Sequence, residues 1–275
     1  MFKLFRRRQR RPAASAPEPD LRGTLPDAPE WTIELIQSVR HLTMTSPERI
    51  FALCQAMEYV VRQSIPGDVV ECGVWRGGSM VAAARTLIRL NATDRNLWLY
   101  DTFEGMTEPA DDDVDWSGRP AGQLLQLADP ADAESIWCRS PEEGVREVLT
   151  QTGYPTERLT FVRGPVEETL VRTVPQQIAL LRLDTDWYES TRCELEHLFP
   201  RLAPGGVLII DDYGHWQGCR KAVDEYLARH RIPLLLSRID YTGRIGIKPR
   251  MGETEPNDVQ DHNINAIASE IADVA

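Results

Sequence analysis

The chain has 275 residues, of which 42% are apolar and 27% are charged. This profile is typical of a globular protein with one large α/β domain or two small ones. No stretch approaches ~18 uninterrupted apolar residues, so we expect no membrane-spanning helix. The five cysteines are widely spaced and form no CxxC pair, which argues against a disulfide framework or a zinc site and predicts a cytoplasmic location.

The charge is distributed unevenly along the chain, with a net value of −11. Residues 1–12 carry six cations and no anion, whereas residues 252–275 carry six anions and no cation. The body is therefore acidic and has no basic stripe, so nucleic acid is not an expected partner. The basic segment 3–11 predicts weak contact with an acidic membrane surface. No apolar core follows it, so we expect no secretory signal peptide.

The chain is expected to form one domain over residues 31–251. Residues 1–30 are first basic and then rich in Ala and Pro, without an apolar period, and we interpret them as an extension. A helix is predicted at Trp31–Arg40, and a second begins at Ser46, a capping residue followed by Pro47 in the first turn. Residues 252–275 are predicted to be an acidic tail.

From residue 68 onward, short β-type runs alternate with helical segments, which predicts a parallel sheet covered on both faces. The predicted strands are Val69–Cys72, Leu97–Tyr100, Leu159–Val162, Ile178–Leu183, Val207–Ile210, Pro233–Ile239 and Gly243–Ile247. The predicted helices lie near Ser79–Leu90, Pro141–Gln151, Ser190–Phe199 and Gln217–His230. No helix separates the last two strands, so they should form an antiparallel hairpin at one edge. Residues 107–140 are predicted to be a lid or insertion, with the acids of 111–115 in a solvated loop.

A glycine-rich loop, ECGVWRGGS at residues 71–79, follows the first strand and opens a helix. Gly73 and Gly77 allow a tight turn and the close approach of a ligand. The spacing is not the GxGxxG of dinucleotide-binding proteins. A carboxylate at Glu71 would repel a pyrophosphate but suits an ammonium group, such as the amino-acid end of S-adenosylmethionine. The alternative is a strand-to-helix turn without a ligand.

An acid, Asp101, ends the second strand, 24 residues after Gly77. An acid at about this distance binds the ribose hydroxyls of an adenosine ligand. The alternative is a solvated acid or a helix cap.

Four acids follow two neighbouring strands. The strand 178–183 ends in Asp184-Thr-Asp186, and Pro204-Gly205-Gly206 turns the chain into the strand 207–210, which ends in Asp211-Asp212. A single helical crossover places such strands side by side, so these carboxylates should meet at one edge of the sheet. Their repulsion requires a cation or retained protons, and an all-oxygen site suits a hard ion such as Mg²⁺. Helix capping accounts for one or two of the acids but hardly for all four.

A histidine, His215, lies three residues after Asp212. It is a candidate for substrate contact or for accepting a proton. A surface or packing role is the alternative.

Together these residues make the chain resemble the macrocin O-methyltransferase family over roughly residues 66–248. The resemblance is carried by VVECGVWRGGSM, LWLYDTFEGM, LRLDTDWYEST and LAPGGVLIIDDYGHWQGCRKAVDEY. It implies a Rossmann-like class I methyltransferase fold: an α/β, seven-stranded, mostly parallel sheet with helices on both faces and a C-terminal antiparallel hairpin. It also implies an S-adenosylmethionine-dependent O-methyltransferase.

The resemblance further implies S-adenosylmethionine and a divalent metal, normally Mg²⁺, as cofactors. The implied metal ligands are Asp184, Asp211 and Asp212, and the resemblance implies that Asp186 is the general base. Together with the histidine described above, the candidate catalytic residues are Asp184, Asp186 and His215. Whether Asp186 or His215 is the base stays open. The implied cofactor-binding residues are Glu71, Gly73, Val74, Trp75, Gly77, Ser79, Asp101, Phe103 and Gly164.

The expected acceptor is a hydroxyl of a sugar or of a glycosylated compound, either a glycan or a natural product. A small catechol or phenol is the alternative acceptor. A Rossmann-type oxidoreductase predicts GxGxxG and no acid cluster, and this sequence has the reverse. A non-catalytic binding module is expected to lack one of the metal acids, and none is missing. A homo-oligomer is compatible with the sequence.

Overall fold

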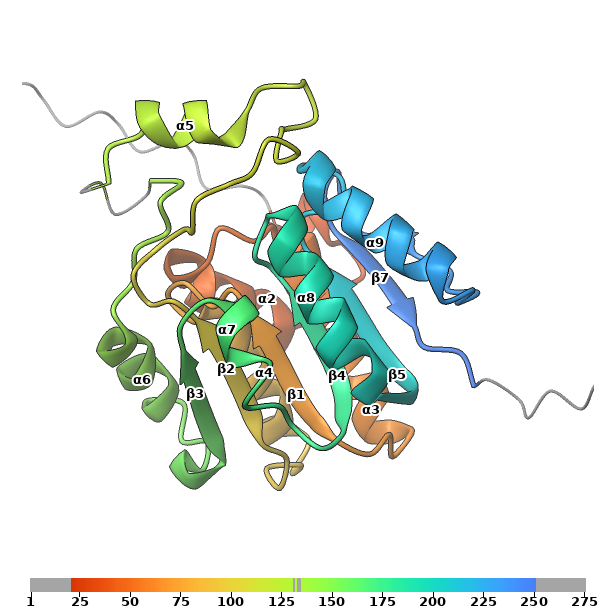
Figure 1. Ribbon diagram of the computed structural model, residues 1–275. Helices are drawn as coiled ribbons and strands as arrows, with labels where there is room; N and C mark the ends of the chain where they lie inside the picture. Colours follow the sequence, from red (N-terminus) through yellow and green to blue (C-terminus); the bar gives the residue numbers. More distant parts are fainter. Residues whose placement is uncertain (1–20, 131, 133–134, 251–275) are drawn as a thin grey trace, which may run out of the picture.

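A seven-stranded sheet in the order β3-β2-β1-β4-β5-β7-β6 forms the centre of the molecule (Figure 1). The computed structural model describes residues 21–130, 132 and 135–250. The strands are β1 (Asp68–Cys72), β2 (Leu97–Asp101), β3 (Leu159–Arg163), β4 (Ile178–Leu183), β5 (Leu202–Ile210), β6 (Ser237–Arg238) and β7 (Arg244–Ile247). The first five strands pair in parallel, and β7 pairs antiparallel with both β5 and β6. The predicted parallel sheet with an antiparallel hairpin at its edge is confirmed.

Helices cover both faces of the sheet (Figure 1). Helices α2, α3 and α4 pack on one face, where the inward side chains include Val69 of β1. Helices α7, α8 and α9 pack on the other face, where the next residue of β1, Val70, is buried. Both faces of β1 are therefore buried, as expected for a parallel strand in the middle of a sheet. The helices are α1 (Leu21–Thr24), α2 (Glu30–Val39), α3 (Pro47–Arg62), α4 (Gly78–Arg89), α5 (Ala121–Leu127), α6 (Glu142–Thr150), α7 (Val166–Thr169), α8 (Tyr188–Leu198) and α9 (Gln217–Arg229).

Local signals explain several of these boundaries. The side chain of Ser46 accepts a hydrogen bond from the backbone N–H of Arg49, and Pro47 occupies the first turn of α3, as predicted. The hairpin is shorter than expected, because residues 233–236 run outside the ladder and only Ser237–Arg238 pair with β7. The expected turn at residues 204–206 is instead an irregular part of β5, which already begins at Leu202.

The structure differs from one expectation about the flanking segments. Residues 21–30 are not part of an extension outside the domain: α1 precedes α2, and Leu21, Leu25 and Ala28 are buried against the α2–α4 side of the core. The domain therefore begins at least ten residues before the predicted boundary at residue 31. The basic segment 3–11 and the tail 252–275 lie outside the described residues.

The acidic run at 111–115 is also not simply a solvated loop. Asp113 is buried and accepts hydrogen bonds from the backbone N–H groups of Ala110 and Tyr188. Asp115 is buried as well, and accepts from the backbone N–H groups of Ser117 and Arg119. These two acids therefore hold the segment that leads into α5 in a fixed shape. In the described ranges, no helix has the length and apolarity needed to cross a membrane.

Candidate active site

A cavity of about 370 Å³ lies at the carboxyl ends of the central strands. The segment between β2 and α6 contributes to its wall through Met106, Leu125 and Ile136, among others. Most of the predicted site residues line this cavity, namely Gly73, Val74, Trp75, Ser79, Asp101, Gly164, Asp184, Asp186, Asp211, Asp212 and His215. The predicted residues Glu71, Gly77 and Phe103 are not part of the wall. Parallel strands bring their carboxyl ends together, which explains why residues so distant in the sequence meet here.

The glycine-rich loop packs directly against the end of β4. Gly73 has a φ of +82°, and a Cβ atom there would lie 1.8 Å from the carbonyl oxygen of Asp184. Gly77 also has a positive φ and caps α4, and its missing side chain makes room for Val145. Gly77 therefore shapes the loop from behind the cavity. The indole Nε1 of Trp75 is buried and has no hydrogen-bond partner among the described residues, so this part of the wall fits the acceptor group of a ligand.

Asp101, at the end of β2, holds the loop in place. One carboxylate oxygen accepts the backbone N–H groups of Val74 at 2.6 Å and Trp75 at 2.9 Å. The other oxygen accepts the N–H of Phe103 at 2.7 Å. Burial raises the pKa of Asp101, and these three hydrogen bonds oppose that shift. Phe103 itself packs against Phe161 behind the cavity. The contact of Asp101 with a ribose stays a prediction.

The predicted cluster of acids is present. Asp184, Asp211 and Asp212 each offer a carboxylate oxygen, and these oxygens lie within 4.8 Å of one another. The second oxygen of Asp212, Oδ2, is buried without a hydrogen-bond partner in the described part of the chain. Three converging carboxylates with one orphaned oxygen fit a hard divalent cation, which prefers oxygen ligands.

Asp186 lies beside this cluster on the cavity wall. Its backbone has a φ of +69°, a conformation that is strained for a residue other than glycine. The side chains of Asp186 and Asp212 are hydrogen-bonded to each other. Burial, followed by the charge of Asp184, raises the pKa of Asp186 to about 7. Two carboxyl groups this close retain a proton between them.

A buried arginine inside β4, Arg182, is the central residue that the sequence analysis missed. Its side chain is 3% exposed. Nη1 donates to Glu71 at 2.6 Å and to Asp184 at 2.7 Å, and Nη2 donates to Asp211 at 2.6 Å and to Thr45 at 2.8 Å. Arg182 therefore neutralises part of the acidic cluster from below. The signal was available, because an arginine within an otherwise apolar, buried strand must find partners.

The position of Glu71 differs from the expectation. Its carboxyl group is 1% exposed, is held by Arg182 and does not reach the cavity wall. Burial raises the pKa of Glu71 to about 8, although the positive charge of Arg182 lowers it in part. Glu71 is thus a partner of the arginine beneath the site, and the predicted contact with an ammonium group would need a rearrangement.

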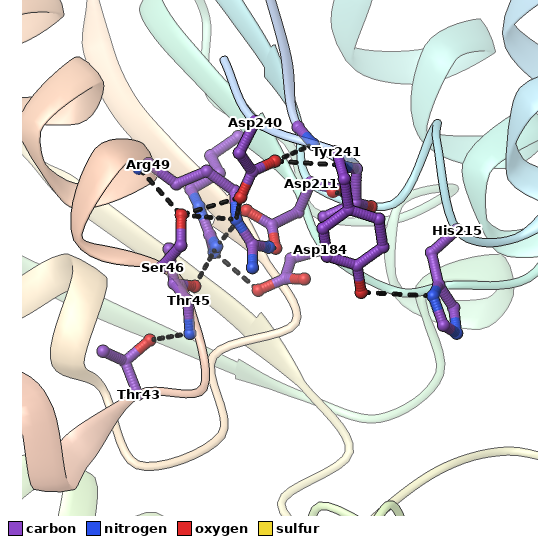
Figure 2. A network of polar contacts seen from close by, with 12 residues as sticks. Thr43, Thr45, Ser46, Arg49, Asp184, Asp211, His215, Asp240 and Tyr241 are labelled. Atoms are coloured by element: carbon purple, nitrogen blue, oxygen red, sulfur yellow. Dashed lines mark hydrogen bonds and ion pairs between the residues drawn. The ribbon is translucent and has the colours of Figure 1, made fainter. Parts of the chain in front are cut away.

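A second arginine, Arg49 of α3, approaches the cluster from the side (Figure 2). It pairs with Asp211, and its Nε donates to Asp240 at 2.9 Å. The hydroxyl of Ser46 donates to the same carboxylate at 2.7 Å. Arg49 thus joins α3 to the acids after β5 and to the turn between β6 and β7. Helical periodicity gives no hint of this role, because the partners lie more than 160 residues away.

His215 lies in the loop between β5 and α9 and lines the cavity. Its Nδ1 is 3.2 Å from the hydroxyl oxygen of Tyr241 (Figure 2). The ring packs edge-on against Trp216, with the centroids 4.8 Å apart. Burial lowers the pKa of His215, so the ring is neutral at pH 7.

The sequence matches the family described as Macrocin-O-methyltransferase (TylF) over residues 12–245. The chain belongs to this family. It is an S-adenosylmethionine-dependent O-methyltransferase.

Two relatives of the methyltransferase have names that state a reaction. One, from Streptomyces olivaceus, is 8-demethyl-8-(2,3-dimethoxy-alpha-L-rhamnosyl)-tetracenomycin-C 4'-O-methyltransferase, which is 37% identical over 206 residues, 75% of each chain. Another, from Micromonospora griseorubida, is mycinamicin III 3''-O-methyltransferase, which is 34% identical over 73% of this chain and 76% of that protein.

Solved structures agree with this assignment. The O-methyltransferase NovP is 31% identical, with a TM-score of 0.66 over 76% of this chain and 83% of that chain. The calicheamicin methyltransferase CalS11 is 25% identical, with a TM-score of 0.54 over 88% of this chain and all of that chain. The expected Rossmann-like methyltransferase fold is confirmed.

Proposed function

We propose that this methyltransferase transfers the methyl group of S-adenosylmethionine to a hydroxyl of a sugar-bearing natural product, with the help of a divalent cation. The observation that carries the proposal is a single cavity that joins the glycine-rich loop to the cluster of Asp184, Asp211 and Asp212. The relatives named above act on a rhamnosyl tetracenomycin and on mycinamicin III. Both names specify O-methylation at a numbered position, and the first names a rhamnosyl compound.

The cofactor end of the cavity is formed by the loop 73–79 together with Asp101 and Gly164. The buried indole N–H of Trp75 is an available donor for the methionine or adenosine part of the cofactor. Gly73 lets the loop lie directly on the end of β4, so the part of the cavity that would hold the cofactor borders the acids. Such positioning contributes much of the rate of a direct displacement.

The three carboxylates of Asp184, Asp211 and Asp212 would hold the cation. A divalent ion at such a site lowers the pKa of a coordinated hydroxyl. Arg182 and Arg49 keep the carboxylates apart and in register by pairing with Asp184 and Asp211 from the protein side. The orphaned oxygen of Asp212 is left to face a ligand.

Asp186 is the candidate base. It lines the cavity beside the cation ligands, and its pKa of about 7 allows it to be ionised in a large fraction of molecules at neutral pH. The acceptor oxygen attacks the methyl carbon, its proton passes to Asp186, and the departing group is S-adenosylhomocysteine. A hydrogen bond from the side chain of Trp216 keeps the ionised base oriented.

Two measurements test the proposal. Calorimetry with S-adenosylmethionine should give micromolar-scale binding. Labelled methyl transfer should then occur to methyl α-L-rhamnopyranoside and not to 3,4-dihydroxybenzoate, a catechol. Transfer only to the catechol would replace the sugar with a phenolic acceptor, and a protein that does not bind S-adenosylmethionine would contradict the whole proposal.

A further inference from the structure

Tyr241 lies in the turn between β6 and β7. Tyr241 is 60% exposed, yet it lines the cavity that His215 also lines. The two side chains meet through the Tyr241 hydroxyl and His215 Nδ1, which are 3.2 Å apart (Figure 2). An exposed tyrosine that makes this contact at the mouth of a cavity is placed to act on whatever enters.

The turn that carries Tyr241 is fixed on both sides. The carboxylate of Asp240 is held by Arg49 and Ser46 and also accepts the backbone N–H of Thr242 at 2.9 Å (Figure 2). The hydroxyl of Thr242 donates to the carbonyl of Asp211 at 2.7 Å. Tyr241 is therefore tied to the same segment that supplies the acids of the site.

The loop that carries His215 is packed directly onto this turn. The N–H of Gly214 donates to the carbonyl of Thr242 at 2.9 Å, and a Cβ atom on Gly214 would lie 2.1 Å from the carbonyl oxygen of Tyr241. On its other side, the His215 ring rests against the indole of Trp216. Both partners of the hydrogen bond are thus held before any ligand binds.

The chemistry of the two groups assigns the proton. A neutral imidazole has one bare nitrogen, which accepts, and one N–H, which donates. Imidazole nitrogen is a better acceptor than a phenol oxygen, so the Tyr241 hydroxyl donates to Nδ1 and the ring proton resides on Nε2. Nε2 makes no hydrogen bond with the described residues, which leaves its N–H available to an oxygen of a ligand.

We propose that Tyr241 is a positioning residue that keeps His215 in the Nε2–H form, and that this N–H binds an oxygen of the acceptor. The inference rests on the proposed function, because a polyhydroxylated sugar supplies such oxygens beside the hydroxyl that is methylated. It also separates the two candidate bases: His215 donates a hydrogen bond, and Asp186 takes the proton.

The tautomer is measured directly by ¹⁵N NMR of the imidazole side chains in the full chain at pH 8. The His215 signals are assigned with the His215→Gln variant. We expect a protonated-type shift at Nε2 and an unprotonated-type shift at Nδ1 in the wild type, and a mixture of both forms in Tyr241→Phe. Tyr213→Phe is the matched control. It also removes a tyrosine hydroxyl, but this hydroxyl donates to Asp224, and Tyr213 does not line the cavity. A wild-type ring protonated on Nδ1, or a Tyr241→Phe variant with unchanged shifts, would overturn the proposal.

Turnover tests the donor itself, with methyl α-L-rhamnopyranoside as the probe. Glutamine places its amide N–H near the position of Nε2, whereas asparagine reaches only the position of Nδ1. His215→Gln should therefore keep kcat/KM within about tenfold of the wild type, and His215→Asn should lose about ten times more, the usual effect of one hydrogen bond. Tyr241→Phe should raise KM for the sugar about tenfold with little change in kcat. Equal losses in the two His215 variants would contradict the donor role.

Different outcomes test the proposed acceptor and the role of Tyr241. If the wild type binds S-adenosylmethionine but leaves the rhamnoside unmethylated, the proposed acceptor is wrong. If methylation is present but the tautomer is Nδ1–H, the role of Tyr241 is wrong while the proposed function stands.

Discussion

Replacing Arg182 with methionine should destabilise the fold, because this guanidinium is the common partner of three acids. Asp211 would keep its pair with Arg49, and the Asp184 side chain, which is 26% exposed, would be partly solvated. Glu71 would lose the only partner that its Oε1 atom has among the described residues, while its Oε2 already has none. The expected loss in the free energy of unfolding is about 3–5 kcal/mol, the usual cost of breaking a buried pair.

A double variant that also replaces Glu71 shows which group causes the loss of stability. The variant Arg182→Met/Glu71→Met replaces both groups with apolar side chains of similar length. Because it no longer buries an unpaired carboxyl, it should recover about 2 kcal/mol of the loss. The surface residue Arg192 provides the control: it also contacts two carboxylates, those of Glu189 and Glu196, but is about one-third exposed. Arg192→Met should cost at most about 1 kcal/mol.

Urea unfolding followed by circular dichroism at pH 7 measures all four proteins on one scale. The reasoning is refuted if Arg182→Met loses no more stability than Arg192→Met. It is also refuted if the double variant is no more stable than Arg182→Met alone.

Three further predictions follow from the same region. Gly73→Ala should abolish cofactor binding in calorimetry, because its Cβ would clash with the Asp184 carbonyl, whereas Gly144→Ala, which meets no atom within 4 Å, should bind normally. In steady-state assays, Asp184→Asn should raise the Mg²⁺ concentration needed for half-maximal activity. Asp186→Asn should lower kcat about 10²–10⁴-fold and leave the Mg²⁺ dependence unchanged. The reverse result would assign the base to Asp184 and the cation ligand to Asp186. The folded-state pKa of Glu71 is raised, so its stabilising contribution is present at low pH and is lost as the pH rises towards 8. In urea titrations between pH 5 and 8, the free energy of unfolding of the wild type should therefore fall as the pH rises. Glu71→Gln should make this slope shallower by up to about 1.4 kcal/mol per pH unit. Identical slopes in the wild type and the variant would argue against a raised pKa of Glu71.

The sheet could be predicted from the sequence because its central strands are short apolar runs that end in acids or glycines. Such runs have no helical period, and their alternation with amphipathic helices specifies a parallel sheet. The elements that were missed are the short helices α1, α5 and α7, which have four, seven and four residues. Helices of this length are stabilised by packing against the domain rather than by their own sequence. The core position of Leu21 and Leu25 is likewise decided by tertiary contacts.

The acids of the site were predictable for a related reason. Asp184, Asp211 and Asp212 directly follow two neighbouring parallel strands, β4 and β5. The ends of these strands bring the three acids together, and this placement can be read from the order of the elements in the sequence. The role of Glu71 could not be derived in this way, since its partner Arg182 comes from the neighbouring strand β4, 111 residues later. Long-range partners of a side chain depend on register and rotamer, which no local pattern records.

Dependence of sugar methylation on a divalent cation is the most direct test of the proposed function. The full chain is treated with EDTA, and labelled methyl transfer from S-adenosylmethionine to methyl α-L-rhamnopyranoside is then followed as Mg²⁺ is returned, in the wild type and in Asp212→Asn. We expect EDTA to abolish transfer and Mg²⁺ to restore it in the wild type. Asp212→Asn should recover little activity, because it loses a carboxylate oxygen of the cluster. Transfer to the sugar at full rate in the presence of EDTA would contradict the account.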